Sequence, residues 1–277
     1  MFIAGTDEVI TSLQNPGIKN VVKLRRRADR DEQGLLIVEG YRELKRALEN
    51  NRRPVSLFYC MDFFLGKNEP ELISRCRDAG VEILSCSRAV FAKMAYRERP
   101  EGLLALIPQV KNDLSGLKLP AAPLLIVAEA IEKPGNLGTI LRSADAAGAD
   151  AVIVCDRCTD VNNPNVVRAS VGALFTVPLA ETSSAEAIQW LHGKKIQILA
   201  ASPHGKLAYT QADLRRGTAI VVGAEQYGLS AQWMKAADLQ VRIPMHGQID
   251  SLNVAAATTI LLFEAARQRG HDDLQLR

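Results

Sequence analysis

The second half of the chain contains short, almost wholly apolar segments that alternate with stretches of helical character. The apolar segments are residues 124–129, 151–155, 196–201, 219–223 and 239–243, and a long apolar helix is expected at 254–269. A run that is apolar at consecutive positions predicts a strand buried on both faces, and its alternation with helices predicts a parallel sheet. Ligands of such sheets bind beyond the carboxyl ends of the strands. The loops after these strands are therefore the first place to look for function.

The first part of the chain predicts a smaller α/β domain. Its expected strands are residues 35–38, 55–60, 81–86 and 103–107, and its expected helices are residues 41–50, 71–79 and 88–95. Residues 108–123 are rich in Pro and Gly and predict a linker. The predicted organisation is a domain at 1–107, the linker at 108–123 and a second domain at 124–277.

Composition excludes several classes of protein. The chain has 277 residues, 47% of them hydrophobic and 23% charged, which is typical of globular domains. No apolar run reaches the ~18–20 residues that span a bilayer, and the N-terminus lacks the basic region of a signal peptide. We therefore expect a cytoplasmic protein with no membrane partner.

The cysteines predict neither disulfides nor a metal. Their number is five, and no export signal is expected. Cys155 and Cys158 form a C-x-x-C pair, but no second pair of cysteines or histidines follows to complete a zinc site. Two reduced thiols at a strand end are the preferred interpretation, and no metal is expected.

The positive charge is concentrated in the N-terminal part. Through Ala105 there are 18 Lys and Arg against 15 Asp and Glu, whereas the remainder has 16 of each. Much of the excess lies in one cluster, from which we predict RNA-backbone contacts by Lys23, Arg25, Arg26, Arg27 and Arg30. The alternative is a solvated helix face, because Asp29, Asp31 and Glu32 lie among these cations.

Three loops of the second domain carry unusual residues. The first, residues 132–150, contains Asn136, Gly138 and Arg142; the last two are four residues apart and share a helix face. The alternative without a functional role is that Arg142 forms a surface ion pair with Asp145. The second loop, VVGAEQYGLS (221–230), places a glycine where a strand ends, so that backbone groups can approach a ligand. The third, RIPMHGQIDSLNVAAA (242–257), leads into the last helix, with Ser251 as the expected N-cap.

Together these loops resemble the three motifs of the SPOUT methyltransferases of the TrmH/SpoU type. The matching segments are NLGTILRSADAAG, VVGAEQYGLS and IPMHGQIDSLNVAAA, and RASVGALFTVP (168–178) resembles the segment between the first two. ITSLQNPGIK, LIVEG and EGLLAL are similar to pieces of the family's ribosomal-protein-like substrate-binding domain. The resemblance is greatest to members that modify ribosomal RNA, including antibiotic-resistance methylases. One departure is Ala147, where many members have an aromatic residue before the glycine.

The resemblance implies an RNA 2′-O-ribose methyltransferase that uses S-adenosylmethionine. It implies a deep trefoil knot in the second domain, an exception to the rule against knots, and a homodimer whose active site borrows residues across the interface. The cofactor residues implied are Gly223, Ile243, Met245, Leu252 and Asn253.

Arg142 matches the family's catalytic position. A guanidinium holds its proton too tightly to act as a base. We therefore expect Arg142 to bind the ribose hydroxyl and an adjacent phosphate. The identity of the general base that removes the hydroxyl proton stays undetermined. Asn136 is expected to position the same region, and Glu225 to orient Arg142 or Asn136.

Other functions stay open at this point. Asp156 lies 21 residues after Gly135, roughly the separation in a dinucleotide-binding Rossmann site, although the loop lacks G-x-G-x-x-G. A transfer RNA substrate is a second alternative to ribosomal RNA. A non-catalytic RNA-binding protein is a third, against which the complete third motif argues.

Overall fold

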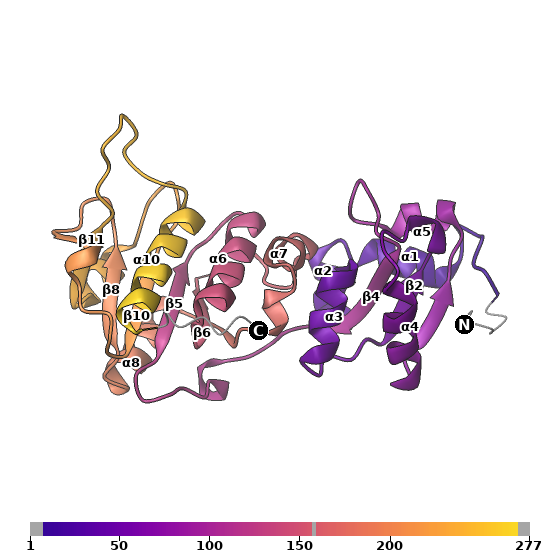
Figure 1. Ribbon diagram of the computed structural model, residues 1–277, viewed down its shortest axis with the longest axis horizontal. Helices are drawn as coiled ribbons and strands as arrows, with labels where there is room; N and C mark the ends of the chain where they lie inside the picture. The colour runs from indigo at the N-terminus through magenta and orange to yellow at the C-terminus, as the bar shows by residue number, and fades with distance from the viewer. Residues whose placement is uncertain (1–7, 157–158, 271–277) are drawn as a thin grey trace. The chain divides into compact units, whose positions relative to one another are not determined.

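The structure is a computed structural model that describes residues 8–156 and 159–270. Contacts divide the chain into two units, each with its own sheet (Figure 1). One unit comprises the chain up to Val110 together with Val161–Thr176. The other comprises Lys111–Asp160 together with the chain from Val177 onward.

The first unit has a four-stranded mixed sheet in the order β1-β4-β2-β3. Its strands are β1 (Leu35–Glu39), β2 (Ser56–Tyr59), β3 (Glu82–Ser85) and β4 (Leu103–Pro108). Strand β4 is antiparallel to both neighbours, and β2 is parallel to β3. All four strands were predicted from their apolar runs.

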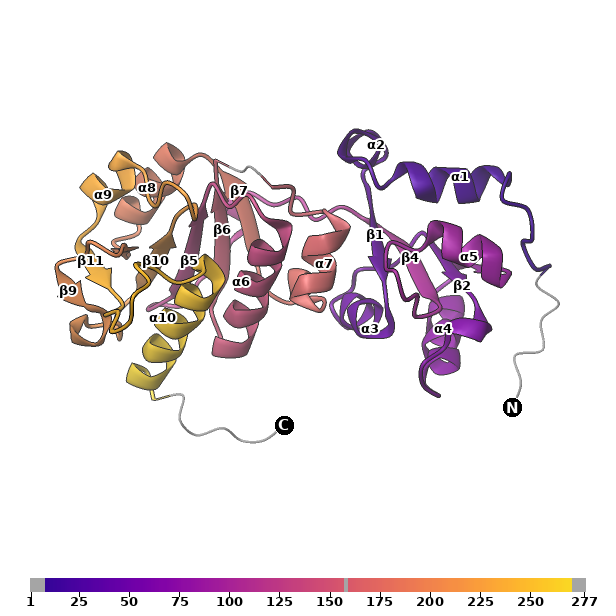
Figure 2. The same ribbon diagram turned by 90° about the horizontal axis from the view of Figure 1, so that it is seen from above.

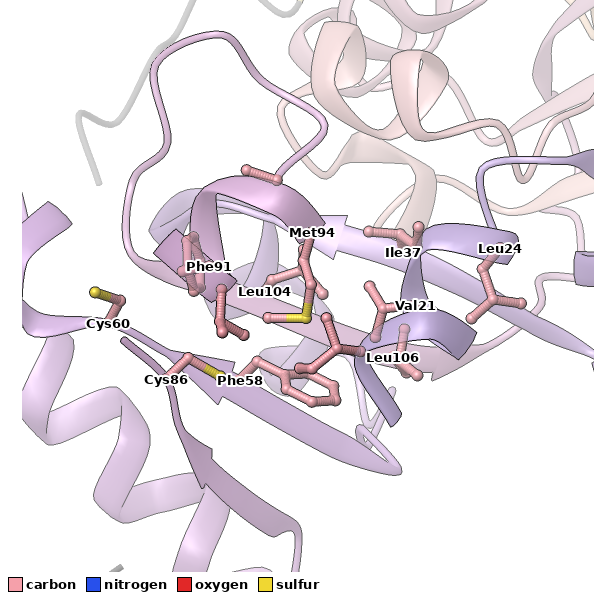
Figure 3. Close-up of a cluster of buried hydrophobic side chains, with 13 residues drawn as sticks. Val21, Leu24, Ile37, Phe58, Cys60, Cys86, Phe91, Met94, Leu104 and Leu106 are labelled. Carbon is pink, nitrogen blue, oxygen red and sulfur yellow. The ribbon is translucent and has the colours of Figure 1, made fainter. Parts of the chain in front are cut away.

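Helices cover both faces of this sheet (Figure 2). They are α1 (Pro16–Lys23), α2 (Arg27–Gln33), α3 (Tyr41–Glu49), α4 (Glu69–Asp78) and α5 (Arg88–Met94). Apolar residues of α1 and α5 pack against the strands in one cluster, which includes Val21, Phe91, Phe58 and Leu104 (Figure 3). The burial of these side chains is the main source of stability on this face.

The second unit has a seven-stranded sheet in the order β7-β6-β5-β10-β8-β11-β9, in which every neighbouring pair is parallel. Its strands are β5 (Leu124–Glu129), β6 (Ala151–Cys155), β7 (Leu179–Thr182), β8 (Gln197–Ala201), β9 (Leu207–Ala208), β10 (Thr218–Val222) and β11 (Leu239–Arg242). The fold class was predicted correctly, but β7 and β9 were not predicted. Both are edge strands with half-buried residues, so neither has the continuous apolar run that marked the inner strands.

Two pairs of helices enclose this sheet (Figure 2). Helices α6 (Pro134–Ala147) and α10 (Val254–Gln268) pack together on one face, where the hydroxyls of Ser143 and Thr259 are 2.7 Å apart. Helices α8 (Ser184–Gly193) and α9 (Ala231–Ala236) cover the other face. Among the described residues, no helix is both long enough and apolar enough to cross a bilayer.

The unit boundaries differ from the predicted domains at residues 161–176. This segment contains α7 (Pro164–Ser170), which packs against β1 in the first unit. The Asn162 side chain pairs with both backbone groups of Val110, with N–O distances of 2.8 and 3.1 Å, and Arg46 donates to the carbonyl of Val171. Contacts so distant in sequence leave no local signal. The strand order does not define a knot by itself, so the trefoil knot stays a prediction.

Candidate active site

A cavity of about 460 Å³ lies at the carboxyl ends of β8, β10 and β11, within the ~300–1,000 Å³ range of small-molecule sites. Its walls are the loops after these strands and the start of α10; the loop from β11 to α10 projects beyond the sheet (Figure 1). Gly223, Ile243, Met245 and Leu252 line it, as do Ser202, Pro203 and His204. A larger depression of about 730 Å³ beside α8 is shallow and open to solvent, so it cannot enclose a ligand.

A tight turn after β10 forms one wall of this cavity. The amide of Gly228 donates to the carbonyl of Ala224 at 2.8 Å, and Gly228 has φ +67°, which favours glycine. Gly223 is in such close contact that a Cβ there would overlap the backbone of Gly228 and lie 2.6 Å from the amide of Leu229. The glycines of the second loop therefore serve the closure of the turn as much as the approach of a ligand.

Four polar side chains meet at the start of this turn. Glu225 accepts hydrogen bonds from Asn136 at 2.8 Å, from Asn253 at 2.6 Å and from Lys133 at 2.5 Å. The amide of Asn253 also donates to the Asn136 oxygen at 3.2 Å. This polar network joins segments that are far apart in the sequence. The orienting role of Glu225 toward Asn136 stays a prediction, which this contact supports. No described contact joins Glu225 to Arg142.

The network holds Glu225 in its charged form. The hydrogen bond from Lys133 is the largest cause that lowers the pKa of the Glu225 carboxyl, and those from Asn136 and Asn253 add to it. The same contact raises the pKa of Lys133. A carboxylate whose oxygens already accept three donors has little capacity left to take a proton, so Glu225 is better suited to positioning than to general base catalysis.

Asn253 has a different place from the one predicted. It is absent from the residues that line the cavity, and it is the N-cap of α10, where its side-chain oxygen accepts from the amides of Ala255 and Ala256. Ser251 is therefore not the cap. Sequence alone does not separate the two because both residue types are strong N-caps.

Arg142 lies on the exposed side of α6 and is absent from the cavity lining. Its guanidinium makes no hydrogen bond or ion pair with any residue that the structure describes. The surface pair with Asp145 is therefore not formed. A cation without a partner among the described residues is available to a ligand or to another chain.

The structure separates the predicted RNA-binding cations into two groups. Arg30 is only 2% exposed and donates to the carbonyls of Leu24 and Arg25, so its assignment to an RNA contact is wrong. Arg25 is held by three carbonyls at the end of α5. Lys23, Arg26 and Arg27 are exposed, with Asp29 and Asp31 as partners of the two arginines at 3.3 Å. Net charge in a sequence does not reveal which cation of a short helix faces inward.

The remaining predictions concern cysteine and Asp156. Burial raises the pKa of the Cys155 thiol to about 12, and its C-x-x-C partner Cys158 lies outside the described residues. Within the described part of the chain, no three His, Cys, Asp or Glu residues are grouped as metal ligands. The Asp156 carboxylate accepts from the amide of Ser184 at the start of α8, a local role unrelated to a ribose.

Comparison with known proteins identifies the family. Residues 123–263 match the model of the SpoU rRNA methylase family, and residues 15–105 match an MRM3-like substrate binding domain. The chain belongs to the SpoU rRNA methylase family. It is 31% identical to the 23S rRNA (uridine(2479)-2′-O)-methyltransferase of Streptomyces viridochromogenes, covering 89% of this chain and 87% of that one.

Solved structures agree over both units. A crystal structure of an RNA 2′-O ribose methyltransferase is 40% identical with a TM-score of 0.83, covering 94% of this chain and 98% of the other. The AdoMet-bound rRNA methyltransferase of Sinorhizobium meliloti is 30% identical with a TM-score of 0.86, covering 94% and 97%. The Rossmann alternative is thereby excluded, and S-adenosylmethionine is the cofactor of this family member.

The residues present suit this cofactor. Apolar side chains such as Ile243, Met245 and Leu252 can enclose an adenine, and the strand-end backbone after β10 offers hydrogen bonds to its edge. Sequence analysis missed Lys133 and the loop at 202–204. The latter follows β8, so the rule that ligands bind at the carboxyl ends of strands could have found it.

The closed turn after β10 generates the first prediction. Gly223→Ala should force the Gly228 backbone away and weaken S-adenosylmethionine binding about 10-fold or more, since overpacking costs ~1–3 kcal/mol. Isothermal titration calorimetry measures this affinity. Gly193→Ala, in α8, is the control, because a Cβ there meets no atom within 4 Å. Equal affinities of the two variants would contradict the role given to this turn.

Proposed function

We propose that this protein methylates the 2′-hydroxyl of a ribose in ribosomal RNA, with S-adenosylmethionine as the methyl donor. The observation that carries the proposal is that the polar network shares Glu225 with the cavity at the strand ends. Relatives named as 23S rRNA 2′-O-methyltransferases, in Streptomyces viridochromogenes and Bacillus subtilis, support ribosomal RNA over transfer RNA. Because such a substrate is found with ribosomes, we place the activity in the cytoplasm.

For this reaction the protein must mainly align the ribose hydroxyl with the methyl group of the cofactor and remove the hydroxyl proton. S-adenosylmethionine supplies a methyl group on a sulfonium, which is already a good leaving group. The polar network fixes the amide groups of Asn136 and Asn253 beside the cavity. Alignment of this kind removes much of the barrier by itself. Arg142 would bind the hydroxyl and the neighbouring phosphate with its planar donors and favour ionisation of the hydroxyl.

We also propose that Arg142 acts on the cavity of a second copy of the chain. Its guanidinium is exposed and absent from the lining of its own cavity. On the same face of the sheet, α10 leaves Phe263 50% exposed. A symmetric dimer through α6 and α10 would cover this apolar side chain and bring each arginine to the other site.

The central test of the proposed function is a map of ribose methylation. Ribosomal and transfer RNA from cells with and without the gene would be compared nucleotide by nucleotide. We expect one 2′-O-methyl group in ribosomal RNA to disappear on deletion and to return with the wild-type gene. Loss of a mark only from transfer RNA would contradict the substrate, and no change in either RNA would contradict the activity.

Arg142→Ala should lower single-turnover methyl transfer by at least ~10²-fold, as expected for a group that acts on the transferred proton or the developing charge. The affinity for S-adenosylmethionine should stay the same, because the proposed contacts of Arg142 are with the ribose hydroxyl and a phosphate, whereas other residues enclose the cofactor. Arg142→Lys should restore little activity, since an ammonium lacks the planar two-pronged geometry. Near wild-type turnover by Arg142→Ala would end the assignment.

A mixing experiment tests action across the interface. With S-adenosylmethionine kept well below the Kd of Gly223→Ala, the homodimers of Arg142→Ala and of Gly223→Ala should each be strongly impaired. Mixed dimers should regain activity, because one of their two sites combines an intact cavity with an intact arginine. If mixing restores nothing although native mass spectrometry of differently tagged chains shows mixed dimers, Arg142 acts within its own chain.

The exposed cations of the first unit generate the next prediction. Charge reversal at Lys23, Arg26 and Arg27 together should weaken RNA binding and lower the slope of log affinity against log salt by about 2 to 3, roughly one for each lost phosphate contact. The control is charge reversal at Lys45, Lys67 and Arg75. These exposed cations lie outside the α1–α2 segment, on α3, in the loop before α4 and on α4, respectively. Equal slopes in the two triple variants would make the predicted cluster an ordinary solvated surface.

A further inference from the structure

Tyr227 is exposed to an extent unusual for an aromatic residue. Its side chain is 78% exposed, the highest value among the large hydrophobic residues of the described chain. Tyr227 is also one of the residues that line the cavity described above. Single exposed apolar side chains are common on protein surfaces, so exposure points to a ligand here only together with the place of Tyr227 in the lining of the cavity.

The backbone that carries this ring is constrained. Tyr227 occupies the turn closed by the hydrogen bond from Gly228 to Ala224, and the contact of Gly223 with Gly228 tightens that turn. Two residues earlier, Glu225 is fixed by donors from Lys133, Asn136 and Asn253. The ring is therefore presented from a constrained turn beside the polar network, so binding need order its side-chain torsions but not the backbone.

We propose that Tyr227 stacks on a base of the RNA next to the ribose that is methylated. This inference rests on the proposed function and names a residue that would position its substrate. Sequence-specific recognition of RNA uses unpaired bases that stack on aromatic side chains. A stack on the turn that carries Glu225 would place the neighbouring ribose beside Asn136 and Asn253.

Substitutions can distinguish the contribution of the aromatic ring of Tyr227 from that of its hydroxyl. Stacking uses the π face, so phenylalanine should replace tyrosine, whereas leucine offers apolar area without that face. The loss of one stacked base, ~1–3 kcal/mol, corresponds to an affinity change of about 5- to 150-fold. Tyr227→Ala and Tyr227→Leu should therefore raise the KM for RNA by this factor, with kcat little changed.

The test uses full-length protein and 23S rRNA purified from cells that lack the gene. Tyr227→Phe should have a KM for RNA within about 3-fold of the wild type, well below the factor expected for loss of a stack. Tyr209→Ala, the same truncation at another tyrosine of this unit, serves as the control. Calorimetry should give the same S-adenosylmethionine affinity for wild type and Tyr227→Ala. Unchanged KM for RNA in Tyr227→Ala, weakened cofactor binding, or dissociation of a dimer would each overturn the proposal.

A direct readout keeps this inference separate from the proposed function. Tyr227→Trp places an exposed indole on the turn, and a stacked base should quench its fluorescence beyond the signal of Trp190 and Trp233 in the wild type. Quenching by the rRNA without methyl transfer would leave the stacking role standing and contradict the proposed function. Methyl transfer without extra quenching, in a protein that binds the RNA, would contradict the stacking role and leave the proposed function standing.

Discussion

The candidate site depends on the hydrogen bonds that converge on the Glu225 carboxylate. They join the beginning of α6, the turn after β10 and the N-cap of α10 through Asn136, Glu225 and Asn253. The ion pair with Lys133 is largely exposed, and such pairs contribute little to stability. The network is therefore better explained by its effect on position: one anion fixes the two amide groups at the starts of α6 and α10, two helices that already pack together.

The parallel sheet makes this convergence possible. Strand β10 lies between β5 and β8, and β11 lies on the other side of β8. Because all of these strands run in the same direction, the loops that follow β5, β8, β10 and β11 emerge at one edge. The loop after β5 begins α6 with its asparagine, and the loop after β11 leads to the capping asparagine of α10. Strand order thus brings together residues separated by more than a hundred positions.

The sequence predicted the strands that are buried along their whole length. It did not predict the features that depend on contacts between distant parts of the chain. The inner strands β5, β6, β8 and β10 were predicted because both of their faces are apolar, whereas the edge strand β7 was not. The candidate site residues were predicted by resemblance, but the capping role of Asn253 needed coordinates. Arg30 was misassigned because its inward direction follows from the packing of a seven-residue helix, which composition does not record.

Within one copy of the chain, the groups suited to the cofactor and those suited to the substrate lie in different surroundings. Groups suited to enclose a small ligand, such as Ile243, Met245 and Leu252, line the cavity of a single chain. Groups suited to RNA point outward: Arg142 has no partner among the described residues, and Tyr227 is 78% exposed. Exposed groups cannot order a flexible polymer by themselves, since both the polymer and the side chains lose entropy on binding. A second chain that supplies Arg142 against a cavity flanked by Tyr227 would provide a wall on each side of the reacting nucleotide. Dimer formation would then be a condition for catalysis and not only for stability.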